Sequence, residues 1–115
     1  MPRSMSFALT KPQIRKRTKT VTRRLGWENL KPGEQVWAVE KAQGLKKGEK
    51  QVRLCLIECV RNQPGPLYMI SEADCTREGF PDMTPEQFIT MFCNANRCEQ
   101  NQIVNRIEFK YVEAE

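Results

Sequence analysis

The sequence predicts an α+β fold, a small mixed β-barrel of about five strands with two or three short flanking helices. Apolar stretches with the two-residue period of β-strands recur along the chain, and a helix start signal precedes residue 85. The 115 residues match the length of one ordinary domain and contain no internal repeat. Short strands that pair over long sequence distances around so small a core favour a partly closed barrel over a sandwich.

The N-terminal part is expected to hold a tail, a helix and then extended chain. Residues 1–6 lack the apolar middle of a signal peptide and are expected to form a flexible tail, with residues 7–115 as the single domain. Residues 7–17 predict a short helix with Pro12 in its first turn. The β-branched residues that follow are poor helix formers, so the chain beyond Lys19 is expected to be extended or turn-like.

Three further strands are predicted, each with its own local signal. Lys-Pro-Gly-Glu at 31–34 predicts a turn that leads into a strand over residues 35–40. Residues 51–61 are apolar on both faces, as in the middle of a barrel, and Asn-Gln-Pro-Gly-Pro at 62–66 breaks that pattern. The last strand is expected over residues 103–112. An exposed connection is expected over residues 44–50, which are rich in Gly and Lys.

The segment between the last two strands is expected to be mainly helical. Residues 67–70 predict a short extended piece, after which Ser71 can cap a brief helical turn over residues 72–75. Thr84, Pro85 and Gln87 then match a capping box with proline at the first helical position. That helix is expected to end near residue 93, and residues 94–101 to be irregular.

The charge distribution favours a polyanionic partner. The chain has 19 Lys and Arg against 14 Asp and Glu, and six cations without an acid lie between residues 15 and 24. Such a basic segment favours nucleic acid, with a solvated helix face as the alternative. No stretch approaches the roughly 20 apolar residues of a membrane span, so no membrane partner is expected.

The absence of histidine and the presence of five cysteines limit the chemistry. Without histidine, a Ser-His-Asp or Cys-His arrangement is excluded, so any acid–base catalyst must be Lys, Glu, Asp, Tyr or Cys with a shifted pKa. An odd number of cysteines without an export signal favours a reducing, cytoplasmic compartment. Because no Cys-x-x-Cys occurs, we predict neither a metal site nor a cofactor.

Lys-Thr-Val-Thr-Arg-Arg at 19–24 is the leading candidate site. It offers a compact charge, two hydroxyls and two planar guanidiniums within six residues, a set that suits a phosphate-bearing ligand. In an extended segment neighbouring side chains point to opposite faces. Thr20, Thr22 and Arg24 are therefore expected to face the ligand, and Arg23 to be a surface residue or a phosphate contact.

Residues on either side extend this candidate site. Trp27 is a candidate for stacking on a base, with burial in the core as the alternative. Arg15, Lys16 and Arg17 are candidates for a track along an RNA backbone, with a solvated helix end as the alternative. Phe80 is a candidate for the lining of the ligand cleft.

The motif at 19–24, followed by Lys-Pro-Gly-Glu-x-Val at 31–36 and Arg-Glu-Gly-Phe at 77–80, resembles the ASCH domain, a branch of the PUA-like fold. The resemblance runs from residue 7 to residue 111 and is closest to small stand-alone ASCH proteins of bacteria and phages. In those proteins a Met-Thr-Pro-Glu-x-Phe helix like that at 83–88 also follows. The resemblance implies a β-barrel with flanking helices and a cleft that binds RNA or a nucleotide-like ligand.

The same resemblance implies roles for individual residues. Some similar proteins hydrolyse the amide of an N4-acylated cytidine with a motif lysine, the second motif threonine and a later glutamate. These roles fall on Lys19, Thr22 and Glu78, and the motif arginine is Arg24. Another ASCH protein is a ribonuclease, so the fold does not determine the reaction.

Lys19 and Glu78 support two interpretations if they meet in a cleft. A lysine made partly neutral by desolvation could take a proton from Thr22 or water, and Glu78 could protonate a leaving amine. Alternatively, the two form a structural ion pair. The sequence thus leaves three hypotheses: a monomeric cytoplasmic protein that binds RNA or a modified nucleoside, a small amidohydrolase or ribonuclease, and a phage accessory protein that binds a host protein.

Overall fold

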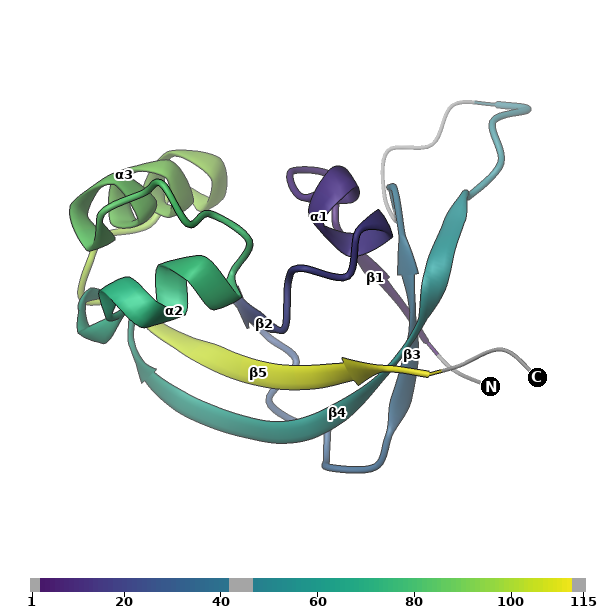
Figure 1. Cartoon of the computed structure of the whole chain (residues 1–115), viewed down its shortest axis with the longest axis horizontal. Helices are drawn as coiled ribbons and strands as arrows, with labels where there is room; N and C mark the ends of the chain where they lie inside the picture. The colour runs from purple at the N-terminus through teal and green to yellow at the C-terminus, as the bar shows by residue number, and fades with distance from the viewer. Residues whose placement is uncertain (1–2, 42–46, 113–115) are drawn as a thin grey trace.

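A curled five-stranded sheet forms the framework of the protein (Figure 1). The structure is a computed structural model that describes residues 3–41 and 47–112. The strands are β1 (Arg3–Ser6), β2 (Val21–Arg24), β3 (Gln35–Val39), β4 (Arg53–Pro66) and β5 (Ile103–Tyr111). They lie in the order β1-β3-β4-β5-β2, with β1 parallel to β3 and the other pairs antiparallel. The predicted α+β class, with a mixed and partly closed barrel, is confirmed.

Short helices cover one side of this sheet. They are α1 (Lys11–Arg15), the 3₁₀ turn η1 (Leu67–Met69), α2 (Glu72–Arg77) and α3 (Pro85–Asn96). Figure 1 shows α2 and α3 at the end of the sheet where β4 leads towards β5, with α1 between these helices and β3. The strands β1 and β2 are the two edges of the sheet, so the half-barrel has an open seam between them.

The expected flexible tail is wrong for residues 3–6, which form β1. Met5 pairs with Ala38 of β3 in the parallel ladder, and its side chain is only 1% exposed. Met5 and Phe7 alternate with serines, which is the period of a half-buried strand, but four residues are too few to stand out in the sequence. Residues 1–2 lie outside the described part of the chain.

The first helix is shorter than the expected span of residues 7–17, because it begins at Lys11. Phe7 instead extends the β1 pairing, since its N–H donates to the carbonyl of Val39 at 2.9 Å. Thr10 then closes a turn through an N–H bond to the carbonyl of Phe7 at 3.0 Å. Pro12 lies in the first turn as predicted, and its missing N–H disfavours a helix that starts a full turn earlier.

The predicted break at residues 62–66 is also wrong, because β4 continues to Pro66. Pro64 pairs with Asn105 of β5, and Pro66 with Ile103. The ladder with β3 reaches only Glu58, so the later part of β4 has β5 as its sole sheet neighbour. Proline is tolerated at such an edge because no second ladder requires its N–H.

The helical signals in the second half are confirmed with small shifts. Ser71 accepts a hydrogen bond from the N–H of Asp74 as the cap of α2, and Thr84 and Gln87 form the reciprocal capping box of α3. Residues 67–70, expected to be extended, contain η1. The helix α3 runs past residue 93 to Asn96, where Arg97 ends it in a left-handed conformation. Residues 47–50 of the expected connection are exposed, and residues 42–46 lie outside the described chain.

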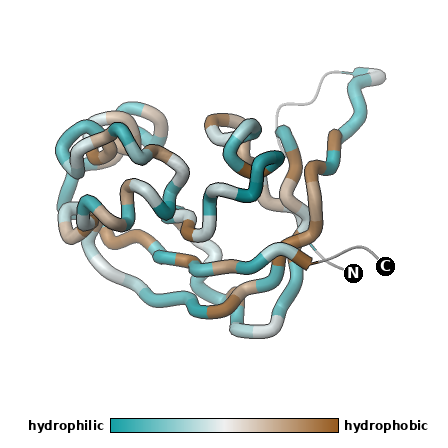
Figure 2. Tube along the Cα trace, in the orientation of Figure 1, coloured by the Kyte–Doolittle hydropathy of each residue, from teal (hydrophilic) through white to brown (hydrophobic). Residues whose placement is uncertain are grey.

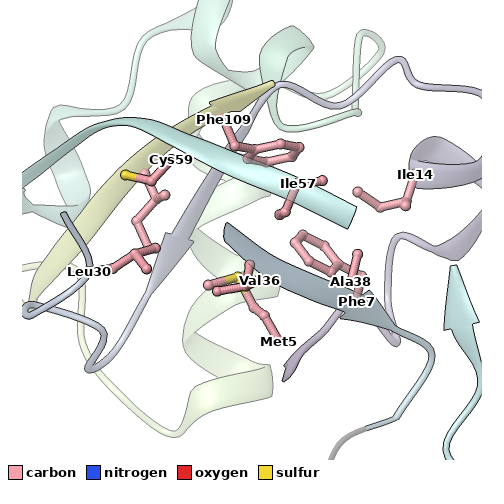
Figure 3. Packing of buried hydrophobic residues seen from close by; sticks show 10 residues of the cluster. Met5, Phe7, Ile14, Leu30, Val36, Ala38, Ile57, Cys59 and Phe109 are labelled. Atoms are coloured by element: carbon pink, nitrogen blue, oxygen red, sulfur yellow. The ribbon is translucent and has the colours of Figure 1, made fainter. Parts of the chain in front are cut away.

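Two apolar clusters hold these elements together. Figure 3 shows the first, inside the half-barrel, where Phe7, Ile57 and Phe109 meet. The second packs Phe88 and Phe92 of α3 against residues near η1 and α2. Figure 2 shows hydrophilic and hydrophobic residues alternating along the strands, and mainly hydrophilic residues over α1. The space between the two clusters is where the candidate site lies.

The buried position of Met5 predicts that β1 contributes to stability. Met5→Ala should lower the free energy of unfolding by about 2–5 kcal/mol, because it leaves a cavity in the core. Met69→Ala is the matched control, since Met69 is 70% exposed, and should change it by less than about 0.5 kcal/mol. Urea denaturation measures both. Equal effects of the two substitutions would contradict the assignment of β1 to the core.

Candidate functional site

A cavity of about 430 Å³ opens at the seam between the two edge strands. Its lining comes from the turn after β1, from Lys19, from β2 and the loop that follows, from the end of α2 and from α3. The lining includes the rings of Phe80, Phe88 and Phe92, which form an aromatic wall, and the charged groups of the predicted motif. The volume falls in the usual range for small-molecule sites, about 300–1,000 Å³.

The Glu78 carboxylate lies at the centre of these charged groups. The Lys19 Nζ donates to the Oε1 of Glu78 and to its main-chain oxygen, both at 2.8 Å. The Arg23 Nη1 donates to the other carboxylate oxygen, Oε2, at 3.0 Å. Lys19, Arg23 and Glu78 are 3%, 8% and 2% exposed, so these charges are buried and mutually compensated. The structure thus brings together two predicted catalytic residues 59 positions apart in the chain.

The environment of Lys19 favours its neutral form more than water does. Burial lowers the pKa of the Lys19 ammonium below its ordinary value, and the Glu78 carboxylate opposes this shift only in part. Arg24 and Arg23 lower the pKa further by charge repulsion. The main chain of Lys19 is fixed by Tyr111, whose hydroxyl donates to the Lys19 carbonyl at 2.6 Å. The lysine is therefore held in one place and loses its proton more readily than an exposed lysine.

Asp74 is a buried residue of the same network that the sequence did not indicate. Its carboxylate accepts hydrogen bonds from Arg23 at 2.5 Å, from Arg77 at 2.8 Å and from Arg106 at 2.7 and 3.1 Å. The hydrogen bonds from Arg106, followed by those from Arg23 and Arg77, hold the pKa of Asp74 well below its usual range. Asp74 lies four residues before Glu78, on the same face of α2, and this spacing is the one sequence signal that could have found it.

Arg23 corrects one expectation about the motif. It was expected at the surface or on a phosphate, but it is buried and joins Asp74 to Glu78. The alternation argument failed because α2 covers the face of β2 that a lone strand would expose to solvent. Arg23 thus lies among the cavity-lining residues with a structural ion-pair role.

Arg24 lines the cavity as expected and differs from the other cations there. Its Nε donates to the Thr22 Oγ1 at 3.1 Å, and its guanidinium lies 4.6 Å from the ring centroid of Phe7. Burial lowers the pKa of Arg24 to about 10, against an opposing effect of Glu78, so it remains a cation at neutral pH. Among residues 3–41 and 47–112, no carboxylate forms an ion pair with Arg24.

Trp27 and Phe80 also line the cavity, as predicted. Trp27 has a left-handed backbone with φ of 65°, which is uncommon for a bulky residue. The amide of Asn62 donates to the carbonyl of Trp27 at 2.8 Å, and Asn105 holds the carbonyl of Gly26 in the same way. The Trp27 ring is half-buried against the core, and the Arg3 guanidinium lies over it. Trp27 therefore packs partly in the core and also lines the cavity.

The remaining predicted residues lie away from the cavity. Thr20 is exposed and does not line it. Arg15, Lys16 and Arg17 are exposed as well and are not part of the lining. Arg15 pairs with Glu40 at 2.6 Å, and Arg17 stacks over the ring of Tyr111 at 5.4 Å. The structure thus separates residues 15–17 from the site that holds Lys19, Thr22 and Glu78.

Two solved structures are similar to this architecture. A DUF984 protein from Enterococcus faecalis V583 superposes with a TM-score of 0.65 at 15% identity, over 97% of this chain and 80% of that chain. An ASCH domain from Lactobacillus crispatus JV V101 gives 0.54 at 16% identity, over 94% and 77%. The chain has an ASCH-like fold. No protein-family model and no curated protein matches the sequence.

The ASCH-like fold does not determine the chemistry of the cavity, which depends on the residues that line it. Within the described chain, no group of three or more His, Cys, Asp and Glu residues could hold a metal ion. No helix of this part is long and apolar enough to cross a membrane.

Sequence reasoning missed the turn over residues 7–10 and the face of α3, which supply half of the cavity lining. Both were missed because they meet the motif only through tertiary packing.

The backbone at Gly79, next to Glu78, leaves no room for a side chain. A Cβ at Gly79 would lie 2.7 Å from the Cγ of Gln13, and the backbone has φ of +101°. Gly79→Ala should therefore destabilise more than Gly33→Ala, a matched control with φ of +91° and no neighbour within 4 Å. Urea denaturation of both variants, with and without Gln13→Ala, measures the contact. If Gln13→Ala relieves none of the difference, the proposed clash is wrong.

Asp74 predicts a defined pH dependence of stability. Its pKa is depressed in the folded state, so its contribution is present above the unfolded value of 3.8 and lost as the pH falls through the folded-state value. Asp74→Asn should lower stability at neutral pH and flatten its decline in acid. Asp82→Asn, at an exposed position of the same charge, should do neither. Urea midpoints from about pH 7 to pH 3 test this, and parallel profiles for Asp74→Asn and wild type would contradict it.

Proposed function

We propose that the protein binds a nucleoside-sized ligand in the cavity at the sheet seam. The observation that carries this proposal is the cavity itself. Its lining brings together the Arg24 guanidinium, which forms no ion pair within the described residues, the Thr22 hydroxyl and an aromatic wall. A planar guanidinium is suited to a base edge or a phosphate, and aromatic side chains are suited to the faces of a base. Phe80 and Trp27 are the aromatic residues we assign to the base.

The size of the cavity favours one nucleoside over a length of RNA. A volume of about 430 Å³ takes a small molecule, whereas an RNA strand needs an open basic track. The track proposed over residues 15–17 is exposed and engaged in part with Glu40 and Tyr111. We assign those residues the weaker role of attracting an anionic ligand or a terminal nucleotide towards the site.

A second candidate function, amide hydrolysis, is favoured by the position of Lys19 and by its lowered pKa. Lys19, Thr22 and Glu78 line one cavity, as the resemblance to acylcytidine amidohydrolases implies. Neutral Lys19 would accept a proton from water as the water oxygen adds to the amide carbon, and would return it to the amine nitrogen as the C–N bond breaks and the acid is released. If the Thr22 hydroxyl attacks first, the same proton transfers form an acyl-threonine and free amine, and water then hydrolyses that ester. Glu78 accepts hydrogen bonds from cations on both carboxylate oxygens, so here it would orient Lys19 rather than donate the proton.

Binding predicts a specific loss of affinity when Arg24 is changed. Arg24→Gln should weaken binding of cytidine or N4-acetylcytidine by about tenfold or more, because a charged hydrogen bond is lost. Arg61→Gln, at an exposed position outside the cavity, should leave affinity unchanged. Isothermal titration with both nucleosides and with short RNAs measures the effect. Tighter binding of RNA than of any nucleoside, insensitive to Arg24→Gln, would contradict the proposal.

Hydrolysis is tested by incubation with N4-acetylcytidine and detection of acetate. Product should form with wild type and disappear in Lys19→Ala, and Glu78→Gln should reduce it strongly. If wild type binds the nucleoside without forming acetate, the protein is a binding protein and the hydrolytic candidate is wrong. If neither nucleosides nor short RNAs bind, the nucleoside proposal fails, and the alternative of a protein partner gains support.

A further inference from the structure

Thr10, at the start of α1, is a buried residue whose hydroxyl makes no hydrogen bond within the described chain and stays accessible to solvent. The residue is 6% exposed and lines the cavity. It occupies the N-cap position of α1, yet its side chain makes no capping hydrogen bond. Its backbone N–H and carbonyl are both engaged, with Phe7 and Ile14, whereas its hydroxyl has no hydrogen-bond partner among the residues that the structure describes.

Packing alone does not explain a hydroxyl at this position. Valine would fill the same volume, and the hydroxyl of Thr10 has no protein partner while it remains accessible to a molecule in the cavity. A capping role is also limited here, because Pro12 in the first turn of α1 has no N–H to offer. The hydroxyl at Thr10 therefore lacks a structural reason within the described chain.

The position of Thr10 connects it to the motif residues of the site. Its N–H donates to the Phe7 carbonyl at 3.0 Å, and the Phe7 ring carries the Arg24 guanidinium at 4.6 Å. Arg24 in turn donates to the Oγ1 of Thr22, so the hydroxyl proton of Thr22 remains available. Thr10, Arg24 and Thr22 are thus three cavity-lining residues with unused hydrogen-bonding capacity.

We propose that Thr10 is a ligand-contacting residue whose hydroxyl binds the hydrogen-bonding edge of the ligand's base. The inference rests on the nucleoside binding proposed above and names a contact within that site. A hydroxyl both donates and accepts, so it suits a heteroaromatic edge on which donors and acceptors are neighbours. A ligand without such an edge displaces water from the hydroxyl without replacing its hydrogen bond and is disfavoured on that ground. Thr10 thereby makes the cavity selective for a base over an apolar ring of the same size.

The test uses cytidine as the probe and two substitutions at one position. Thr10→Val removes the hydroxyl and keeps the shape, and should weaken cytidine binding by about tenfold. Thr10→Ser restores the hydroxyl and should return affinity to within about threefold of wild type. Thr90→Val on α3, exposed and outside the cavity lining, is the matched control and should change nothing. Titration calorimetry gives the affinities.

Thermal unfolding without ligand separates this role from a structural one. Thr10→Val should unfold at the same temperature as wild type or higher, because no hydrogen bond is lost. A lower melting temperature for Thr10→Val would assign the hydroxyl to the fold and overturn the inference. Equal cytidine affinity of Thr10→Val and wild type would also overturn it and leave nucleoside binding intact. Failure of wild type to bind cytidine or any other nucleoside would instead refute the proposed function, and this inference with it.

Discussion

The Glu78 carboxylate, held between Lys19 and Arg23, is the interaction on which the rest of the site depends. Each of these charges is buried, so removal of one leaves another without compensation, which costs far more than the loss of an exposed pair. The contact joins the end of α2 to the segment at β2. It therefore places the chain after Glu78, and with it Phe80 and the α3 wall, across the open seam of the sheet.

The charges around this carboxylate are unequal in a way that suits a ligand. Asp74 and Glu78 compensate Lys19 and Arg23, and Asp74 is further surrounded by Arg77 and Arg106. Arg24 contacts a hydroxyl and an aromatic ring, and no carboxylate of the described residues forms an ion pair with it. A guanidinium in a cavity that makes no direct ion pair with a carboxylate favours an anion or a strong acceptor from outside. The site thus combines a buried network of paired charges with one guanidinium, that of Arg24, which can bind a ligand.

Sequence predicted the elements with local signals and missed those that depend on distant partners. The capping box at Thr84 and the alternation of β3 and β5 are encoded in adjacent residues and were confirmed. The strand β1 exists because β3 offers it a ladder, and the prolines of β4 are tolerated because that end of the strand has one neighbour. Neither fact is visible in a window of a few residues. In the site, Lys19 was named from the basic motif and Glu78 through a family resemblance. Asp74 and the burial of Arg23 follow from the packing of α2 on β2.

A crystal of the protein soaked with cytidine tests the central claim most directly, because it reports both occupancy and place. The account predicts ordered density in the seam cavity, with a polar atom of the nucleoside within hydrogen-bond distance of the Arg24 guanidinium and the base against the aromatic wall. The Lys19–Glu78 pair should stay intact beneath it. Density confined to the exposed surface of residues 15–17, or an empty cavity at cytidine concentrations that saturate the protein in solution, would contradict the account.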